Sequence, residues 1–157
     1  MNEVVHINEL IKKDFIYTNE NLNNADEVFK FIAEKAFENG RSTDKSLTYD
    51  GLCQREDMMS TGLMDGIAIP HTKNESIVEP TVMLIKNNID LDWESLDDKK
   101  IKIIFTILVP DKEGDNTHLR ILSKLSRKLM DDDFKGDIIN NEEPENLLKI
   151  INKALEE

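Results

Sequence analysis

The sequence has a single cysteine, Cys53, among its 157 residues. One cysteine excludes an intrachain disulfide framework and suits a reducing compartment, and Cys53 is typical of a small thiol packed on a helix. Long hydrophobic runs are also absent: the longest apolar stretch, 103–110, is interrupted by Thr106 and is too short to cross a bilayer. Residues 1–20 lack the basic start and apolar centre of a signal peptide. We therefore expect a cytoplasmic protein with no direct membrane insertion.

The sequence also has fewer positive than negative side chains: 20 Lys and Arg against 32 Asp and Glu, which gives a net charge of −12. Such a chain repels phosphate backbones and anionic lipid, so nucleic acid and membrane surfaces are poor partners. A partner with a basic or mixed face fits better, although the charge can also serve only solubility. With 39% hydrophobic and 33% charged residues, we expect one folded domain over residues 1–157.

Periodicity and capping residues predict an alternation of strands and helices. Asn24 and Glu27 form a capping-box pattern, and the run 101–109 is the strongest strand signal, because it is β-branched, apolar and closed by Pro110. We expect that run to be a central strand. Helices are expected at 24–40, 44–58, 116–129, 132–139 and from Pro144 onward, and strands at 15–17, 67–69, 81–85 and 101–109. This alternation is typical of an α/β sandwich.

Polar and apolar positions predict further details of these elements. Polar residues predict a loop at 72–76, and Asn87-Asn88 is expected to end the strand at 81–85. Asn116 is expected to cap the following helix. That helix would present one apolar face made of Leu119, Leu122, Leu125 and Leu129.

The segment 55–71 collects the residue types that carry chemistry. Gly62 and Gly66 permit turns and close backbone approaches, and Pro70 fixes φ just before His71. A short apolar strand at 67–69 would therefore present the His71 imidazole at a stiffened corner. The preceding helix would bring Arg55 toward the same corner.

The string Gly66-Ile-Ala-Ile-Pro-His71, preceded by Arg55-Glu56 and Ser60-Thr61-Gly62, resembles a known motif. It is similar to the phosphoacceptor motif of the fructose/mannitol-type enzyme IIA domains of the phosphoenolpyruvate-dependent sugar phosphotransferase system. The stretches 91–93, 101–110 and 118–125 also resemble the downstream pattern of that family, in the same order. Thr72 departs from the pattern, since many members carry glycine there.

This resemblance implies a fold and an activity. The fold would be a mixed five-stranded sheet sandwiched by helices in a single compact domain. His71 would accept a phosphoryl group from the phosphohistidine of the carrier protein HPr and pass it to a IIB cysteine, serving a membrane IIC permease indirectly. No metal and no organic cofactor is implied.

The residues around His71 have the chemistry that phosphoryl transfer needs. A neutral imidazole, with a reference pKa near 6.5, is a nucleophile that forms a labile bond. His118, in the first turn of its helix, would lie among free amides at the positive end of the dipole and donate to a phosphate oxygen. Arg55 could add a bidentate contact, and Thr61 and the amides of the loop from Gly62 could supply further phosphate-binding donors.

Other interpretations stay open at this point. A nitrogen-type or regulator-associated enzyme IIA would use the same histidine to control protein binding instead of feeding a permease. A metal-dependent hydrolase could use the three histidines and several carboxylates, although their spacing is not diagnostic. The apolar residues Met58, Met59, Leu63 and Met64 could form either an adaptable docking rim or ordinary core packing.

Overall fold

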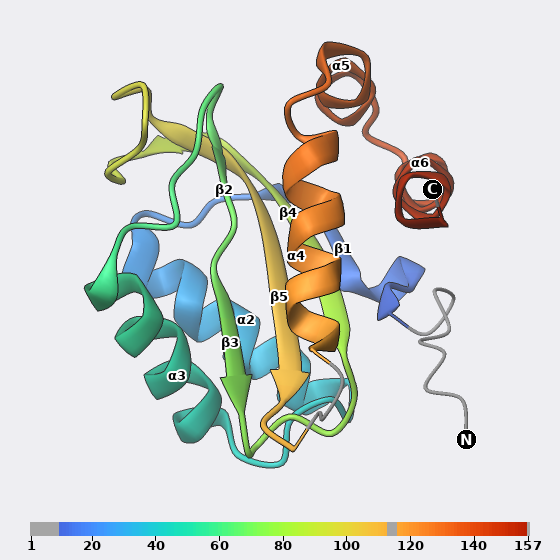
Figure 1. Ribbon diagram of the computed structural model, residues 1–157. Helices are drawn as coiled ribbons and strands as arrows, with labels where there is room; N and C mark the ends of the chain where they lie inside the picture. The colour runs from blue at the N-terminus through green and yellow to red at the C-terminus, as the bar shows by residue number, and fades with distance from the viewer. Residues whose placement is uncertain (1–9, 113–115, 157) are drawn as a thin grey trace.

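The computed structural model describes residues 10–112 and 116–156, apart from the side chains of Thr117 and His118. In this part of the chain a five-stranded sheet has the order β1-β4-β5-β2, and β3 also pairs with β5 (Figure 1). The strands are β1 (Ile16–Glu20), β2 (Ile67–Ala68), β3 (His71–Asn74), β4 (Thr81–Leu91) and β5 (Ile101–Pro110). A short 3-10 turn, η1 (Lys13–Phe15), precedes the first strand.

Strand β5 occupies the middle of the sheet, as its sequence predicts. It pairs antiparallel with β4 and parallel with both β2 and β3, while β1 pairs parallel with β4. All its residues are buried except Lys102 and Pro110, so side chains cover both faces. A strand buried on both faces needs a nearly continuous apolar run, which is the pattern found here.

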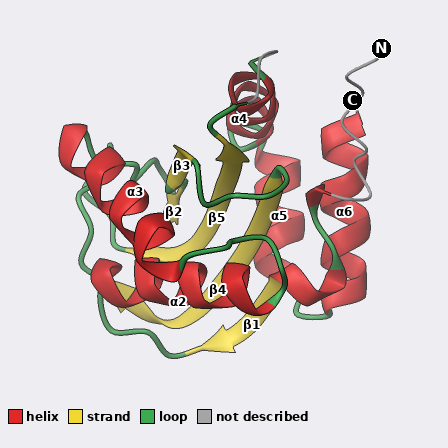
Figure 2. Cartoon of the chain, turned by 90° about the horizontal axis from the view of Figure 1, so that it is seen from below, coloured by secondary structure: helices red, strands yellow, loops and turns green. Residues whose placement is uncertain are grey.

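Two helical layers enclose the sheet. Helices α2 (Ala25–Glu38) and α3 (Lys45–Met58) lie on one side, and α4 (Thr117–Lys128), α5 (Asp132–Asn140) and α6 (Pro144–Glu156) lie on the other (Figure 2). The predicted mixed five-stranded sheet sandwiched by helices is confirmed. Helix α2 starts with Asn24 Oδ1 accepting from the Glu27 amide at 2.8 Å, while the Glu27 carboxylate reaches back to the Asn23 amide at 2.9 Å. The Glu27 carboxylate thus binds the amide of Asn23, whereas in the standard capping box it would bind the amide of the cap residue, Asn24.

Two strand predictions are wrong. The polar segment expected to be a loop contributes β3, because Thr72, Lys73 and Asn74 pair with β5 and this pairing satisfies the backbone whatever the side chains are. The strand expected to end at Asn87-Asn88 continues to Leu91 with a register shift after Lys86. Asn87 is buried there. Its Oδ1 accepts from the Leu22 amide at 2.8 Å, and its Nδ2 donates to the Leu22 carbonyl at 2.9 Å.

The start of α4 also differs from prediction. Asn116 precedes the helix in a left-handed conformation (φ 59°), and its side chain makes no capping hydrogen bond. Leu119 is 52% exposed, whereas Ile121, Leu125 and Leu129 are buried. The buried face is therefore rotated from the row of leucines, because Ile121 takes the inward position.

Residues 61–69 form a small hairpin at the edge of the sheet, just before His71. The Ile69 amide donates to the Thr61 carbonyl at 2.9 Å, and the Leu63 amide donates to the Ile67 carbonyl at 2.8 Å. At the tip, Asp65 and Gly66 both have positive φ, at 59° and 80°. This conformation is natural for glycine and tolerated by aspartate, so the Gly66 prediction of a tight turn is confirmed.

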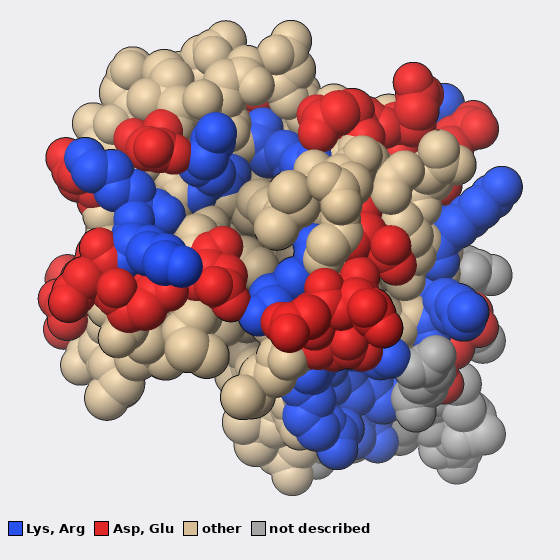
Figure 3. Space-filling view, turned by 90° about the horizontal axis from the view of Figure 1, so that it is seen from above, with Lys and Arg blue, Asp and Glu red and all other residues tan. Residues whose placement is uncertain are grey.

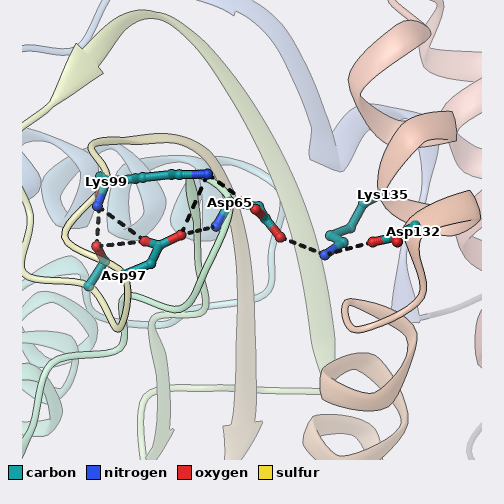
Figure 4. Close-up of polar contacts among 6 residues, drawn as sticks. Asp65, Asp97, Lys99, Asp132 and Lys135 are labelled. Carbon is teal, nitrogen blue, oxygen red and sulfur yellow. Dashed lines mark hydrogen bonds and ion pairs between the residues drawn. The ribbon is translucent and has the colours of Figure 1, made fainter.

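Charged side chains gather at the end of the molecule seen in Figure 3, where lysines alternate with carboxylates around a hollow. A groove of about 510 Å³ lies there, lined in part by Asp65, Lys99 and Lys135. Lys135 Nζ of α5 lies 2.6 Å from Asp65 and 3.4 Å from Asp132, and the Asp65 amide donates to Asp97 at 2.9 Å (Figure 4). These contacts join the hairpin tip, the 95–99 loop and α5.

Among residues 10–112 and 116–156, none of the helices has both the length and the apolarity of a membrane span.

Candidate functional site

His71 is the first residue of β3 and lies opposite Ile107 of β5. The preceding Pro70 has no N–H, and its carbonyl is held by the Ile107 amide at 3.2 Å and by the Thr106 hydroxyl at 2.7 Å. The backbone entering His71 is thereby fixed from the buried central strand. The His71 side chain is half-buried.

Two hydrogen bonds define the state of the His71 ring. Arg55 Nε, which can only donate, lies 3.2 Å from Nε2, and Nδ1 lies 3.0 Å from the Ile69 carbonyl oxygen, which can only accept. Nε2 must therefore be the acceptor nitrogen and Nδ1 must carry the proton. This arrangement leaves a neutral imidazole whose lone pair is on Nε2.

Helix α3 brings Arg55 to this position. One turn earlier, Gly51 faces β3: a Cβ there would lie 2.5 Å from both Thr72 Oγ1 and Asn74 Nδ2. The helix therefore packs close to the strand, and Arg55 follows on the same face four residues later. Arg55 Nη1 also donates to the Met59 carbonyl at 2.7 Å. The sequence prediction that α3 brings Arg55 to the glycine corner is confirmed.

Thr61 and Gly62 lie next to the site, but their donors are already engaged. Thr61 is buried, and its amide and hydroxyl donate to the two oxygens of Glu56 at 3.0 and 2.5 Å. The Gly62 amide donates to Ser60 Oγ at 3.1 Å, and a Cβ on Gly62 would lie 2.1 Å from the Glu94 carbonyl oxygen. The close approach expected at Gly62 is confirmed, while the phosphate-binding role of both residues stays a prediction.

His118 is the second residue of α4, in its first turn, as expected. Figure 1 shows α4 running along β5 with its N-terminal end toward the carboxyl ends of β3 and β5. The His118 side chain lies outside the described part of the chain. Its predicted role therefore stays a prediction.

The methionines around the site are largely exposed. Met58, Met59 and Met64 are 80%, 71% and 40% exposed, which excludes core packing for the first two, whereas Leu63 packs against the core. Cys53 is partly buried on α3, and burial raises the pKa of its thiol. A raised pKa lowers the thiolate fraction, in agreement with a packing role.

Sequence reasoning missed the role of Glu56. Its carboxylate accepts from Thr61 and also from Trp93 Nε1, at 2.9 Å. The Trp93 ring packs edge-on against Phe29 with centroids 5.6 Å apart, so Trp93 anchors its loop onto the core. Glu56 is part of the recognised string, but no pattern in the sequence connects it with a tryptophan 37 positions away.

The arrangement can present an imidazole nitrogen to an incoming electrophile beside a guanidinium group. Such a pair suits transfer of an anionic group, because the imidazole attacks and the cation stabilises negative oxygens. In the described residues no group of three or more His, Cys, Asp and Glu side chains is placed to hold a metal ion.

Comparison with known proteins agrees with this geometry. The family model described as "Phosphoenolpyruvate-dependent sugar phosphotransferase system, EIIA 2" matches residues 9–154. The chain is 35% identical over 127 residues to the PTS system fructose-specific EIIA component of Haloferax volcanii, covering 81% of this chain and 82% of that protein.

Solved structures have the same fold. The nitrogen regulatory protein IIA-Ntr from Neisseria meningitidis superposes with a TM-score of 0.85 at 25% identity, covering 92% of this chain and 98% of that one. Enzyme IIAMtl of Escherichia coli, in its complex with phosphorylated enzyme IIBMtl, superposes with a TM-score of 0.75 at 16% identity, covering 90% and 98%. With a family model that matches nearly the whole chain, the protein belongs to the EIIA type 2 family of the phosphoenolpyruvate-dependent sugar phosphotransferase system.

Proposed function

We propose that this chain is a cytoplasmic phosphoryl carrier of a sugar phosphotransferase system. His71 accepts a phosphoryl group from the phosphohistidine of HPr and passes it to a IIB cysteine, which serves sugar uptake through a membrane IIC permease. The observation that carries the proposal is the pair of hydrogen bonds from Arg55 and to Ile69, because together they leave the lone pair of His71 on Nε2.

The first transfer uses that lone pair. Nε2 of His71 attacks the phosphorus of phosphorylated HPr, so an N–P bond forms here as the N–P bond of the donor breaks and its electron pair returns to the donor imidazole. The ring of His71 becomes positively charged, and the hydrogen bond from Nδ1–H to the Ile69 carbonyl strengthens as it does so. In the second transfer a IIB thiolate attacks the phosphorus, and the electron pair of the Nε2–P bond returns to His71.

Arg55 changes its partner during this cycle. Its Nε–H occupies the Nε2 lone pair in the resting site, so the guanidinium must leave that nitrogen when the phosphoryl group arrives. The bond from Nη1 to the Met59 carbonyl keeps the group nearby, where it can bind the phosphoryl oxygens. His118 at the start of α4 adds a second donor, while Thr61 and Gly62 support the backbone beneath the ring.

The identity of the partners is supported by relatives. The Escherichia coli IIAMtl structure contains phosphorylated IIBMtl, and the Haloferax volcanii relative is described as fructose-specific. These descriptions favour a IIB protein as the acceptor. The proposal of HPr as the donor rests on the resemblance of the string ending at His71 to the phosphoacceptor motif of the family.

A regulatory enzyme IIA is the second candidate. The observation in its favour is the TM-score of 0.85 to the nitrogen regulatory protein IIA-Ntr. In that case the same phosphorylated His71 would control binding to another protein instead of feeding a permease.

Incubation with phosphoenolpyruvate, enzyme I and HPr, followed by intact mass analysis, tests the proposal. We expect one acid-labile phosphoryl adduct on the wild type and none on His71→Ala. His118→Ala should still accept the group, but about 10- to 100-fold more slowly, because one stabilising donor is lost. An adduct of unchanged yield on His71→Ala would refute the assignment of the acceptor.

Addition of purified IIB proteins then separates the two candidates. Rapid loss of the adduct to a IIB cysteine supports the transport role. An adduct that persists with every IIB tested, while its presence changes binding to a regulator, supports the regulatory role.

A further inference from the structure

The Glu56 carboxylate connects three parts of the chain. Oε2 accepts from the Thr61 amide at 3.0 Å and from Trp93 Nε1 at 2.9 Å, and Oε1 accepts from the Thr61 hydroxyl at 2.5 Å. All these donors are neutral N–H or O–H groups. The carboxylate therefore orients the start of the edge hairpin against the end of α3 and the loop after β4.

Thr61 in turn binds Ile69, and the Ile69 carbonyl binds the His71 ring. The Thr61 carbonyl accepts from the Ile69 amide at 2.9 Å, and the Ile69 carbonyl faces His71 Nδ1 at 3.0 Å. Ile69 thus has its N–H tied to Thr61 and its carbonyl tied to the catalytic ring. Because the next residue is Pro70, which cannot donate a backbone hydrogen bond, the Thr61–Ile69 contact is well placed to set the direction of the Ile69 carbonyl.

We propose that Glu56 is a positioning residue for His71 and that Trp93 holds Glu56 in place. The carboxylate acts through Thr61 and Ile69, so that the Ile69 carbonyl keeps the imidazole proton on Nδ1 and leaves Nε2 free of a proton. Glu56 touches neither the ring nor the phosphoryl group. The inference rests on the proposed function, in which Nε2 is the atom that is phosphorylated.

Two neighbouring residues on α3 act on different nitrogens of the His71 ring. Arg55 reaches Nε2 directly, and Glu56 reaches Nδ1 through the hairpin backbone. The two nitrogens of one ring are thus set by two adjacent side chains that leave the helix in different directions. A carboxylate at 56 that only stabilised the fold would have no bearing on which nitrogen of His71 carries the proton.

The test compares Glu56→Ala, Glu56→Gln and Trp93→Phe with the control Asp57→Ala, an exposed carboxylate on the same turn. Nitrogen-15 NMR of the imidazole reports which nitrogen of His71 carries the proton, with no partner protein present. The rate of phosphoryl transfer from phosphorylated HPr is measured separately. Denaturant unfolding identifies variants that fold.

We expect Glu56→Ala to shift His71 toward a mixture of tautomers and to slow transfer about 10- to 100-fold. Glu56→Gln should restore the wild-type tautomer and a rate within about threefold, because an amide can accept from Thr61 and Trp93 with its oxygen and donate to the Thr61 hydroxyl. Trp93→Phe, which removes one donor, should shift both readouts in the same direction but less. Asp57→Ala should change neither.

A folded Glu56→Ala with the wild-type tautomer and rate would overturn the proposal. If that variant does not fold, Trp93→Phe is the deciding variant, and an unchanged His71 tautomer in Trp93→Phe would also overturn the proposal. If the wild type accepts no phosphoryl group, the proposed function fails, while the tautomer measurement still decides whether Glu56 positions the ring.

Discussion

Arg55 is the residue on which access to His71 depends. Its Nε–H covers Nε2 and its Nη1–H is tied to the Met59 carbonyl, so one guanidinium group covers the nitrogen that we propose as the nucleophile and stays beside it. Lysine could supply the charge but has neither the fork geometry nor a second donor fixed relative to the first. The contribution of shape can therefore be separated from that of charge.

Replacement of Arg55 by lysine should slow phosphoryl transfer to His71 by about 10- to 100-fold, because oriented donors on the transferring group are lost. The free energy of unfolding should change by no more than about 1 kcal/mol, since the side chain is only half-buried. Rapid-quench kinetics and urea unfolding measure the two effects. Arg127→Lys, on the exposed side of α4, is the matched control, and an equal loss of rate in both variants would contradict the expectation.

Two glycines are expected to respond to alanine with opposite signs. A Cβ on Gly62 would lie 2.1 Å from the Glu94 carbonyl oxygen, which is backbone and cannot rotate away, whereas at Gly136 in α5 the nearest atom is 4.0 Å away. Gly62→Ala should destabilise the protein by about 1–3 kcal/mol through overpacking. Gly136→Ala should stabilise it by roughly 0.5–1 kcal/mol through lower chain entropy.

Urea unfolding at neutral pH measures both changes. Destabilisation of similar size at the two positions would mean that the close approach at Gly62 is not the cause.

At the scale of elements, the end of α5 depends on a lysine from the sheet. Lys86 of β4 is buried, and the three N–H groups of its Nζ are shared among the carbonyls of Ile138, Ile139 and Asn141, at 2.8, 3.1 and 2.7 Å, and Glu142 at 2.5 Å. The last carbonyls of a helix have no partner within the helix, and a cation there also opposes the negative end of the dipole. Lys86 therefore fastens α5 to the sheet.

Lys86→Met keeps the length of the side chain but removes every one of these donors. We expect a loss of about 2–4 kcal/mol in the free energy of unfolding, because buried carbonyls lose charge-assisted hydrogen bonds. Hydrogen exchange should quicken at the end of α5. Lys102→Met, at the one exposed position of β5, should stay within about 0.5 kcal/mol, and a similar loss there would argue against a specific role for Lys86.

At the scale of the whole molecule, the ion pair between Asp65 and Lys135 joins the edge hairpin to α5. The hydrogen bond from Lys135 holds the pKa of Asp65 below its ordinary value, and the charges of Lys135 and Lys99 act in the same direction. The native state therefore binds this proton less readily than the unfolded chain. The stabilisation is present above the ordinary carboxyl pKa of about 3.9 and is lost as the pH falls through the lowered value in the native state.

Asp65→Asn should lower the melting temperature at pH 7 and lose that effect in acid. Asparagine tolerates the left-handed backbone at this position, so the substitution removes the charge without adding strain. Melting curves of both proteins between pH 7 and pH 2 should converge below about pH 4. Asp57→Asn serves as the control, and a gap between Asp65→Asn and the wild type that does not change with pH would contradict the role of ionisation.

Local patterns in the sequence determined most of the elements and indicated the family to which the chain belongs. The Asn24 cap, the apolar run of β5 and the turn at Gly66 each depend on neighbours a few residues away, where sterics, capping and burial act directly. Such signals are readable in the chain itself. The same holds for the string that ends at His71, whose order of residue types is enough to indicate the family.

Only the tertiary structure decided which donors and acceptors meet. Thr72 and its neighbours are polar yet form a strand, because β5 supplies their backbone partners. Gly51 in mid-helix has its reason in β3, and Glu56 finds Trp93 37 positions away. The physical cause is the same in each case: a hydrogen bond or a close contact needs two groups in the right place, and for groups distant in sequence that place exists only once the chain has packed.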